Sequence, residues 1–323
     1  MNKNILHKNY ISIDGGTSNT RIAFIKNNTV ADRIFLKYGA KDNDTAKTPT
    51  EADSTNPFKI KLKKAIAEII LRNKICEKDI TAVVASGMIT GEKGLFEVKH
   101  IKAPAGIKEL HNGMVKKEFP EICSIPFYFI PGVKTLSENL NGIDIMRGEE
   151  TELMGLTEDI SNSLVILPGS HSKCICVSNE GKIVDFKTFI TGEMLFAIYN
   201  DTILKNSLNI KCEPDEEYLK MGFSYCKENG INEALFKTRI LDTVLNCNKN
   251  QCYGFFMGFL LYGEVSQILK MPQKRIILAG KAYFKYPTAY LLKSFSNKEI
   301  ILTNDSLADN APAMGMIKIY EHT

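Results

Sequence analysis

A polar, glycine-rich turn set between two apolar runs occurs once in each half of this chain, and it restricts the fold more than any other feature. The first turn is Asp14–Arg21 and the second is Pro168–Lys173. An apolar run, a turn and a second apolar run predict a β-hairpin, so the two halves should contain hairpins of related architecture. The flanking runs are Tyr10–Ile13, Ile22–Ile25, Leu164–Leu167 and Cys174–Val177.

The residue types in the first turn suit phosphate and metal binding. Glycines let the backbone turn sharply and approach a ligand without hindrance from Cβ, and hydroxyl and amide side chains add hydrogen-bond donors. Asp14 only accepts hydrogen bonds when ionised, so it suits a hydrated Mg²⁺ better than a phosphate. The alternative is a hairpin in which Asp14 and the glycines only make the turn. The candidate phosphate-binding residues are Gly15, Gly16, Thr17, Ser18 and Asn19.

The second turn carries the same kinds of residue, and later segments add to it. Lys173 suits phosphate as a point charge, whereas His171 could equally be a turn residue whose ring only packs. Two such hairpins could face each other and hold the two ends of one polyphosphate. An apolar strand ending at Gly280 offers a small-residue corner for an adenine ring. The residues expected to bind nucleotide in this half are Gly169, Ser170, His171, Lys173, Thr191, Gly192 and Gly280.

A flexible loop follows the predicted strand Ile80–Ala85 and is a candidate substrate site. It begins with Ser86, Gly87 and Met88. Ligands of open α/β sheets tend to bind at the carboxyl ends of strands, which is where this loop lies. Strands that alternate with helices in this half predict a mixed sheet with a long antiparallel edge and a parallel interior.

The charged segment Ile143–Leu156 supplies the candidate catalytic groups. Arg147 stands beside Glu149 and Glu150, so it could clamp an anionic substrate while one carboxylate serves as a base. Acidic residues in a first helical turn also stabilise the helix dipole, and we interpret Glu152 in this way.

Composition excludes several classes of protein. The 323 residues suffice for two domains, and 44% hydrophobic with 24% charged residues is typical of globular proteins. The net charge of +4 is spread along the chain, which argues against a nucleic-acid partner. No leader-like apolar segment precedes Asp14, and the longest apolar-rich stretch, Tyr253–Val265, is too short to span a bilayer. Eight widely spaced cysteines suit a reducing compartment, so we expect a cytoplasmic protein without a membrane partner.

The commoner nucleotide-binding motifs are missing from the sequence. Neither the GxxxxGK[ST] phosphate loop nor a GxGxxG turn between a strand and a helix occurs. If this chain binds phosphate, it therefore does so with hairpins.

Taken in order, these pieces resemble the actin-like, sugar-kinase and Hsp70-type ATPase superfamily. Within it, the chain resembles the 2-dehydro-3-deoxygalactonokinase family over nearly its whole length. The most specific pieces are MRGEETELMG, LPGSHSK and FKTFITGEM, at Met146–Gly155, Leu167–Lys173 and Phe186–Met194. The resemblance implies an α/β fold of two ribonuclease H-like domains, residues 1–156 and 157–323, each a mixed sheet flanked by helices with a cleft between them. It also implies phosphorylation by ATP, with Mg²⁺, of the 6-hydroxyl of 2-dehydro-3-deoxygalactonate or a related 2-keto-3-deoxy sugar acid.

Carried over residue by residue, the resemblance gives Asp14 the role of holding Mg²⁺ through water. Glu149 corresponds in position to the carboxylate that takes the proton of the attacking hydroxyl, with Asp144 or Glu150 as the alternatives. Arg147, together with Arg21, would pair with the carboxylate of the acid. Ser86, Gly87, Met88 and Glu150 would complete the acceptor site.

The chain departs from the family pattern at positions that bear on substrate choice. Leu95 stands where a Trp is usual, Gly91 stands where a Ser is usual, and Lys281–Tyr283 replaces hydroxyl residues after the AG corner. Two other functions stay open: a phosphatase of the same fold acting on polyphosphate or guanosine phosphates, and a non-catalytic nucleotide-binding sensor. A homodimer is also left open.

Overall fold

The computed structural model describes residues 8–43, 56–156 and 159–322. These form two compact units. The first comprises Met1–Asp159, Gly181–Asp185 and Ser306–Thr323, and the second comprises Ile160–Glu180 and Phe186–Asp305. The division expected between residues 156 and 157 falls beside residues 157–158, which lie outside the described residues, so it stays a prediction.

A six-stranded mixed sheet is the centre of the first unit. β1 pairs antiparallel with β2 and β2 antiparallel with β3, whereas β1, β4 and β7 run parallel and β6 closes the other edge antiparallel to β7. This agrees with the antiparallel edge and parallel interior expected from the sequence. In spatial order the strands are β3 (Thr29–Leu36), β2 (Thr20–Lys26), β1 (Asn9–Gly15), β4 (Ala82–Gly87), β7 (Phe127–Phe129) and β6 (Val115–Lys117).

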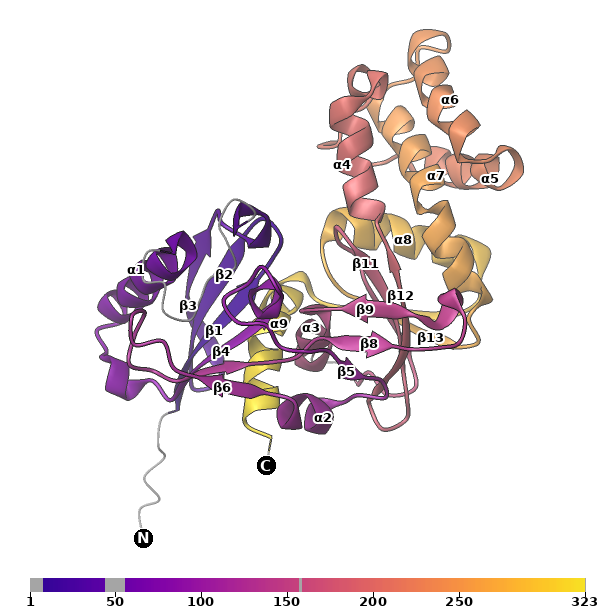
Figure 1. The fold of residues 1–323 in the computed structure, drawn as a ribbon. Helices are drawn as coiled ribbons and strands as arrows, with labels where there is room; N and C mark the ends of the chain where they lie inside the picture. Colours follow the sequence, from indigo (N-terminus) through magenta and orange to yellow (C-terminus); the bar gives the residue numbers. More distant parts are fainter. Residues whose placement is uncertain (1–7, 44–55, 157–158, 323) are drawn as a thin grey trace. The chain divides into compact units, whose positions relative to one another are not determined.

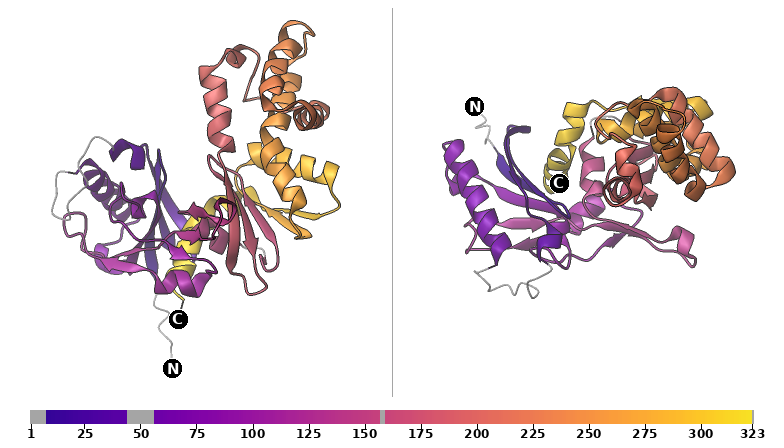
Figure 2. Two further views of the ribbon diagram at one scale, coloured as in Figure 1. Left: turned by 45° about the vertical axis from the view of Figure 1, so that its right-hand side comes forward. Right: turned by 90° about the horizontal axis from the view of Figure 1, so that it is seen from above.

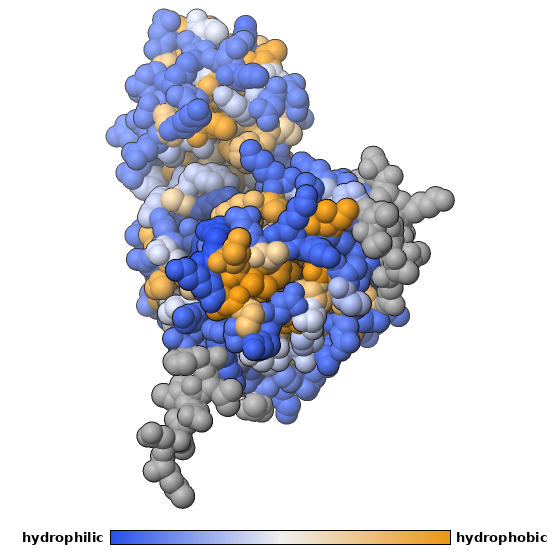
Figure 3. Space-filling view, turned by 90° about the vertical axis from the view of Figure 1, so that its left-hand side faces the viewer, coloured by the Kyte–Doolittle hydropathy of each residue, from blue (hydrophilic) through white to orange (hydrophobic). Residues whose placement is uncertain are grey.

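Helices cover both faces of this sheet. The long helix α1 (Pro57–Arg72) lies on one face and α9 (Asp305–Tyr320) on the other, as Figures 1 and 2 show. Side chains alternate along β1, so Ile11 and Ile13 enter the core beneath α1. Ser12 and Asp14, which point to the opposite face of β1, line a small hollow together with residues of α9. Seen from the side of α1, apolar residues gather near the middle of the first unit's surface, surrounded by hydrophilic ones (Figure 3).

The start of α1 illustrates how local sequence fixes an element. The Asn56 side chain accepts hydrogen bonds from the backbone N–H groups of Phe58 and Lys59, and Pro57 occupies the first helical position. A side-chain cap followed by proline is a typical helix start.

A second, three-stranded sheet and two short helices complete the first unit. β8 pairs parallel with β5 and antiparallel with β9. Helix α3 packs so closely on α9 that a Cβ at Gly155 would overlap the backbone of Ala311. The elements are β5 (Ile101–Lys102), β8 (Val133–Thr135), β9 (Asp144–Met146), α2 (Ile107–Asn112) and α3 (Glu149–Gly155).

The second unit is built on a five-stranded sheet. β10 pairs antiparallel with β11 and parallel with β13, and β13 pairs parallel with β14. In spatial order the strands are β12 (Ile183–Phe189), β11 (Ser172–Val177), β10 (Leu164–Leu167), β13 (Arg275–Leu278) and β14 (Glu299–Leu302). Five helices belong to this unit: α4 (Thr191–Asp201), α5 (Glu216–Asn229), α6 (Ile231–Thr243), α7 (Lys249–Lys270) and α8 (Ala282–Phe295).

The two sheets repeat one topology. The order β3-β2-β1-β4-β7 of the first unit matches β12-β11-β10-β13-β14 of the second, and each begins with an antiparallel hairpin beside a parallel strand. Each unit is a mixed sheet flanked by helices. The α/β fold class that the family resemblance implies, with two mixed sheets flanked by helices, is therefore confirmed.

Candidate active site

In the first unit, three predicted site segments meet at Gly87. Strand register pairs Asp14 with Ser86 and Gly15 with Gly87. Gly87 has φ +79°, and a Cβ there would overlap the carbonyl oxygen of Gly15. Gly148 has φ +115°, and its Cβ would lie 3.2 Å from the Gly87 Cα atom. These close approaches need glycine, and they bring the first hairpin, the Ser86 loop and the start of α3 together.

The turn of the first hairpin is fixed by backbone hydrogen bonds. The Gly16 N–H donates to the Asn19 carbonyl at 2.8 Å, and the Lys41 N–H donates to the Thr17 carbonyl at 3.0 Å. The Thr17 and Asn19 side chains are exposed and that of Ser18 is partly exposed. The turn is thus a rigid backbone that presents polar side chains to the surroundings.

Asp14 is a partly buried carboxylate with one cationic partner. Its Oδ2 atom accepts a hydrogen bond from Arg21 Nη1 at 3.3 Å, and its side chain is 26% exposed. Burial raises the pKa of Asp14, and the Arg21 guanidinium opposes this shift. Asp309 of α9 lines the same small hollow, of about 20 Å³. The sequence analysis did not identify Asp309, because only the fold brings the C-terminal helix to this strand.

Two glutamates of α3 belong to the same group of charges. The Glu149 Oε2 atom accepts a hydrogen bond from the Arg147 backbone N–H at 3.0 Å. Burial, and next the nearby carboxylates of Glu149 and Asp14, raise the pKa of Glu152 to about 8. The helix-dipole interpretation of Glu152 is therefore incomplete. Its position three residues after Glu149, on the same helix face, was a signal for this in the sequence.

The other two candidate bases have different surroundings. Glu150 is fully buried and accepts hydrogen bonds from Ser86 Oγ at 3.1 Å and from the Gly148 N–H at 2.8 Å. Asp144 lies on β9, where its Oδ1 atom accepts from the Ile145 N–H at 2.7 Å. The Glu149 and Asp14 carboxylates both raise the pKa of Glu152, so they lie near one another, and Glu149 stays the predicted base.

Glu150 leads to a prediction about pH. Burial, and next the Glu149 carboxylate, raise the pKa of Glu150 from 4.5 to about 7. The folded state then keeps a proton that the unfolded state releases, so the free energy of unfolding falls between pH 4.5 and 7. The Glu150→Gln variant has no group that titrates at this position, so it lacks this pH-dependent fall. The free energy of unfolding of the variant minus that of the wild type should therefore rise by up to about 3 kcal/mol from pH 4.5 to 8, as measured by urea titration.

The matched control for this prediction is Glu138→Gln, at an exposed glutamate of the same unit. Broken hydrogen bonds would lower the free energy of unfolding of Glu150→Gln by the same amount at every pH. They would not change how this free energy varies with pH. A difference between Glu150→Gln and wild type that stays flat over this range would contradict the raised pKa.

Arg147 holds the loop that follows β4. Its Nη1 atom donates to the carbonyl and the hydroxyl of Thr90, both at 2.6 Å, and its Nη2 atom donates to the Val98 carbonyl at 2.9 Å. The same Nη2 lies 3.1 Å from His100 Nδ1. These terminal nitrogens already have partners within the protein. The clamp on a substrate carboxylate stays a prediction, and it would require Arg147 to exchange some of these bonds.

The second unit repeats this convergence of segments. Gly280 has φ +78°, and its Cβ would lie 2.9 Å from the Pro168 carbonyl oxygen. A Cβ at Gly192 would overlap the Gly169 carbonyl, and the Glu193 N–H donates to the Ser170 carbonyl at 3.3 Å. The second hairpin, the start of α4 and the corner after β13 are therefore in contact.

The polar side chains near the second hairpin are bonded within the protein. The exposed His171 ring places Nε2 2.9 Å from Glu193 Oε1. Lys173 is buried and its Nζ donates to Thr188 Oγ1 at 2.7 Å. The Thr191 hydroxyl donates to Glu264 at 2.8 Å. Their contacts with phosphate stay predictions.

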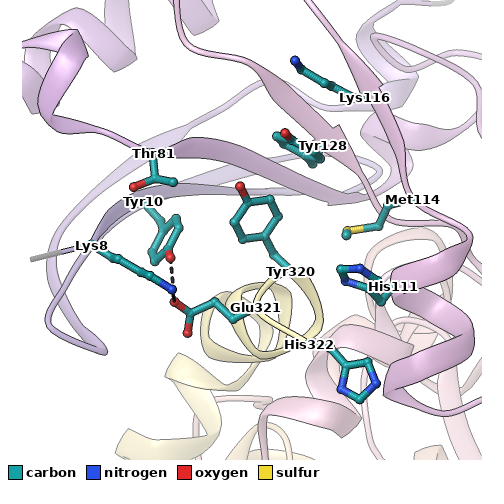
Figure 4. A pocket seen from close by; sticks show the side chains of 10 residues that line it. All are labelled: Lys8, Tyr10, Thr81, His111, Met114, Lys116, Tyr128, Tyr320, Glu321 and His322. Carbon is teal, nitrogen blue, oxygen red and sulfur yellow. Dashed lines mark hydrogen bonds and ion pairs between the residues drawn. The ribbon is translucent and has the colours of Figure 1, made fainter. Parts of the chain in front are cut away.

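A larger hollow of about 640 Å³ lies at the other end of the first unit's sheet (Figure 4). The tyrosine rings of Tyr10, Tyr128 and Tyr320 line it, and Glu321 accepts a hydrogen bond from the Tyr10 hydroxyl at 2.6 Å. It lies by the amino end of β1, whereas Asp14 is near the carboxyl end. None of the residues predicted for the site lines this hollow, so its size does not make it the candidate active site.

The carboxylates near Asp14 can be compared with the ligands that a Mg²⁺ ion requires. Among the described residues, no group of three or more His, Cys, Asp or Glu side chains is arranged to hold a metal ion. Mg²⁺ is usually bound through one or two carboxylates, with water and substrate phosphate completing its shell. Asp14 fits that mode, in which the protein supplies little of the coordination sphere.

Two repeated mixed sheets, each with a polar hairpin between its first two strands, define the actin-like ATPase and sugar-kinase class of fold. A solved structure from Sinorhizobium meliloti, provisionally assigned as a 2-dehydro-3-deoxygalactonokinase, shares this fold with a TM-score of 0.71. It is 20% identical, and the match covers 96% of this chain and 97% of that one. The sequence model of the 2-keto-3-deoxy-galactonokinase family matches residues 14–317. The chain belongs to this family, which consists of phosphotransferases with an alcohol group as acceptor, and the resemblance seen in the motifs is confirmed.

Two curated relatives carry the same name. The 2-dehydro-3-deoxygalactonokinase of Escherichia coli strain K12 is 25% identical over 193 residues, 58% of this chain and 61% of that protein. A Rhizobium meliloti protein provisionally named 2-dehydro-3-deoxygalactonokinase is 29% identical over 128 residues, 39% of this chain and 40% of that protein. The matched region thus spans less than two thirds of each relative.

No helix in residues 8–43, 56–156 and 159–322 combines the length and the apolar character that crossing a membrane requires.

Proposed function

We propose that this protein uses ATP to phosphorylate the terminal 6-hydroxyl of 2-dehydro-3-deoxy-D-galactonate or a related 2-keto-3-deoxy sugar acid. The observation that carries the proposal is the family match over residues 14–317. It is supported by the repeated architecture, in which each sheet presents a polar hairpin against a glycine with positive φ. The cysteine usage of the sequence, which suits a reducing compartment, supports a cytoplasmic location.

The first unit would bind the acceptor and the metal, and its turn of residues 15–19 would line the phosphates of ATP. Bound Mg²⁺ would neutralise phosphate charge, and Asp14 would hold it through water. The Glu149 carboxylate would orient the attacking hydroxyl and take its proton. Glu152, with its pKa near 8, would stay largely protonated at neutral pH and so limit charge repulsion around Glu149. Arg147 would fix the loop after β4, and Arg21 is exposed enough to meet the acid's carboxylate.

The second unit would bind the nucleotide. Its hairpin offers backbone N–H groups and the Ser170 hydroxyl to phosphate oxygens, as nests of backbone amides do in other phosphate sites. Gly280, which packs on Pro168, would leave a flat corner for the adenine ring. Because phosphoryl transfer needs little covalent chemistry from the protein, positioning by these groups would account for most of the rate.

The test is ADP formation from ATP and Mg²⁺ with a panel of 2-keto-3-deoxy sugar acids and plain hexoses. We expect turnover only with a keto-deoxy acid, and phosphorus NMR of the product should place the phosphate on the terminal oxygen. Phosphate release that needs no acceptor would instead support the phosphatase. Nucleotide binding without turnover on any acceptor would support the sensor.

A further inference from the structure

One carboxylate in the second unit is buried in a helix that is mostly apolar. Glu264 lies in the C-terminal half of helix α7, which forms much of this unit's hydrophobic core, and only 2% of Glu264 is exposed. Removing a carboxylate from water is unfavourable unless hydrogen bonds or charges compensate. The partners of Glu264 therefore indicate why it is there.

Each oxygen of Glu264 accepts a hydrogen bond from one hydroxyl group. Ser172 Oγ donates to Oε1 at 2.6 Å, and Thr191 Oγ1 donates to Oε2 at 2.8 Å. Both hydroxyl residues are themselves buried. Burial raises the pKa of Glu264, whereas these two hydrogen bonds lower it.

The two hydroxyls belong to the two segments predicted to bind phosphate. Ser172 is the first residue of β11 and ends the second hairpin, and Thr191 is the first residue of α4. The segments also touch directly, because Gly192 packs on the Gly169 carbonyl. A single carboxylate thus holds the hairpin and the helix start in one arrangement, from the core side.

We propose that Glu264 is a positioning residue for nucleotide binding, which fixes the hairpin Pro168–Lys173 relative to the first turn of α4. Glu264 need not touch the nucleotide for this role. It acts through Ser172 and Thr191, whose neighbours Ser170, His171 and Gly192 are the predicted phosphate contacts. This inference rests on the proposed ATP-dependent function and adds a residue to it.

The experiment compares Glu264→Met, which removes both acceptors at similar size, with Glu264→Gln, which keeps the shape and can bond both hydroxyls. Binding of Mg·ATP without sugar acid is measured by calorimetry, and stability by urea titration. We expect Glu264→Met to weaken binding at least about tenfold, the effect of roughly 1.4 kcal/mol, and Glu264→Gln to weaken it much less. The free energy of unfolding of Glu264→Met should fall, because the buried Ser172 and Thr191 hydroxyls lose their acceptor, so binding is measured under conditions in which the variant is folded.

Two controls separate positioning from a general effect on the helix. Gln267→Met, one turn further along α7, should leave Mg·ATP binding unchanged. The second control is the double variant Ser172→Ala with Thr191→Val. Glu264 acts through these two hydroxyls, so adding Glu264→Met to the double variant should weaken Mg·ATP binding little further.

The outcomes distinguish this inference from the proposed function. Wild-type protein that does not bind Mg·ATP would overturn the ATP-dependent function and this inference with it. If the wild type binds and Glu264→Met binds equally well, only the role of Glu264 is overturned. If Glu264→Gln binds as weakly as Glu264→Met, the role is also overturned, because the loss would then not depend on the hydrogen bonds to the two hydroxyls.

Discussion

Replacing Glu149 by Gln is expected to lower kcat by roughly two powers of ten or more, the usual scale for loss of a general base. The carboxamide keeps the size of the side chain but cannot take the proton of the acceptor hydroxyl. Glu149 lies at the start of α3, next to the group formed by Asp14 and Glu152. Because nucleotide binding is assigned to other residues, the affinity for Mg·ATP should persist. Steady-state kinetics with the preferred sugar acid and calorimetry with Mg·ATP check both parts.

Glu152→Gln is the matched control for this prediction, since it makes the same chemical change three residues later. With its pKa near 8, Glu152 is largely protonated at neutral pH, so a neutral amide should change kcat by only a few-fold. Near wild-type turnover of Glu149→Gln would remove Glu149 from the role of base and direct attention to Glu150 or Asp144.

Replacing Gly87 by Ala is expected to lower the free energy of unfolding by roughly 3 kcal/mol or more. A positive φ costs a non-glycine residue about 1–2 kcal/mol, and overlap with the Gly15 carbonyl adds a steric penalty that moves the first hairpin. Because Asp14 and the start of α3 meet at this glycine, activity should also fall more than stability alone explains. Urea titration and kinetics below the unfolding range provide the two measurements.

Gly181→Ala is the control for the cost of a positive φ in a residue other than glycine. Gly181 has φ +71°, but a Cβ there would have no atom within 4 Å, so only the cost of about 1 kcal/mol for a positive φ applies. If both variants lose the same free energy of unfolding, the close packing of Gly87 on Gly15 contributes nothing to stability. The first hairpin and the loop after β4 would then not be in tight contact at this glycine.

Local patterns predicted the elements near the site well. Polar turns between apolar runs are decided by backbone sterics and by hydrogen bonds within a few residues, so both hairpins could be predicted from neighbouring residues alone. The family motifs added the order of the pieces and the class of enzyme family. Substrate identity does not follow from local patterns, because it depends on contacts with a molecule outside the chain.

The sequence analysis missed residues whose partners are far away along the chain. Asp309 reaches Asp14 only because α9 packs on the face of the sheet formed by β1. Glu264 was hidden in an apolar-rich helix, although a single carboxylate in such a stretch is itself a signal of a buried polar contact. Arg147 was predicted as a substrate clamp from its charge, and the structure shows how much of its guanidinium is bonded to the Thr90 and Val98 loop.

The sequence by itself determined the two hairpins, the mixed α/β class and the family, because short-range sterics and motif order carry that information. Only the tertiary structure decided which glycines are in close contact, which carboxylates influence one another, and which polar side chains are already bonded within the protein. The physical reason is distance. A pKa, a steric overlap or a buried hydrogen bond depends on atoms a few ångströms apart, and in this protein those atoms come from residues that can be separated by more than half the chain.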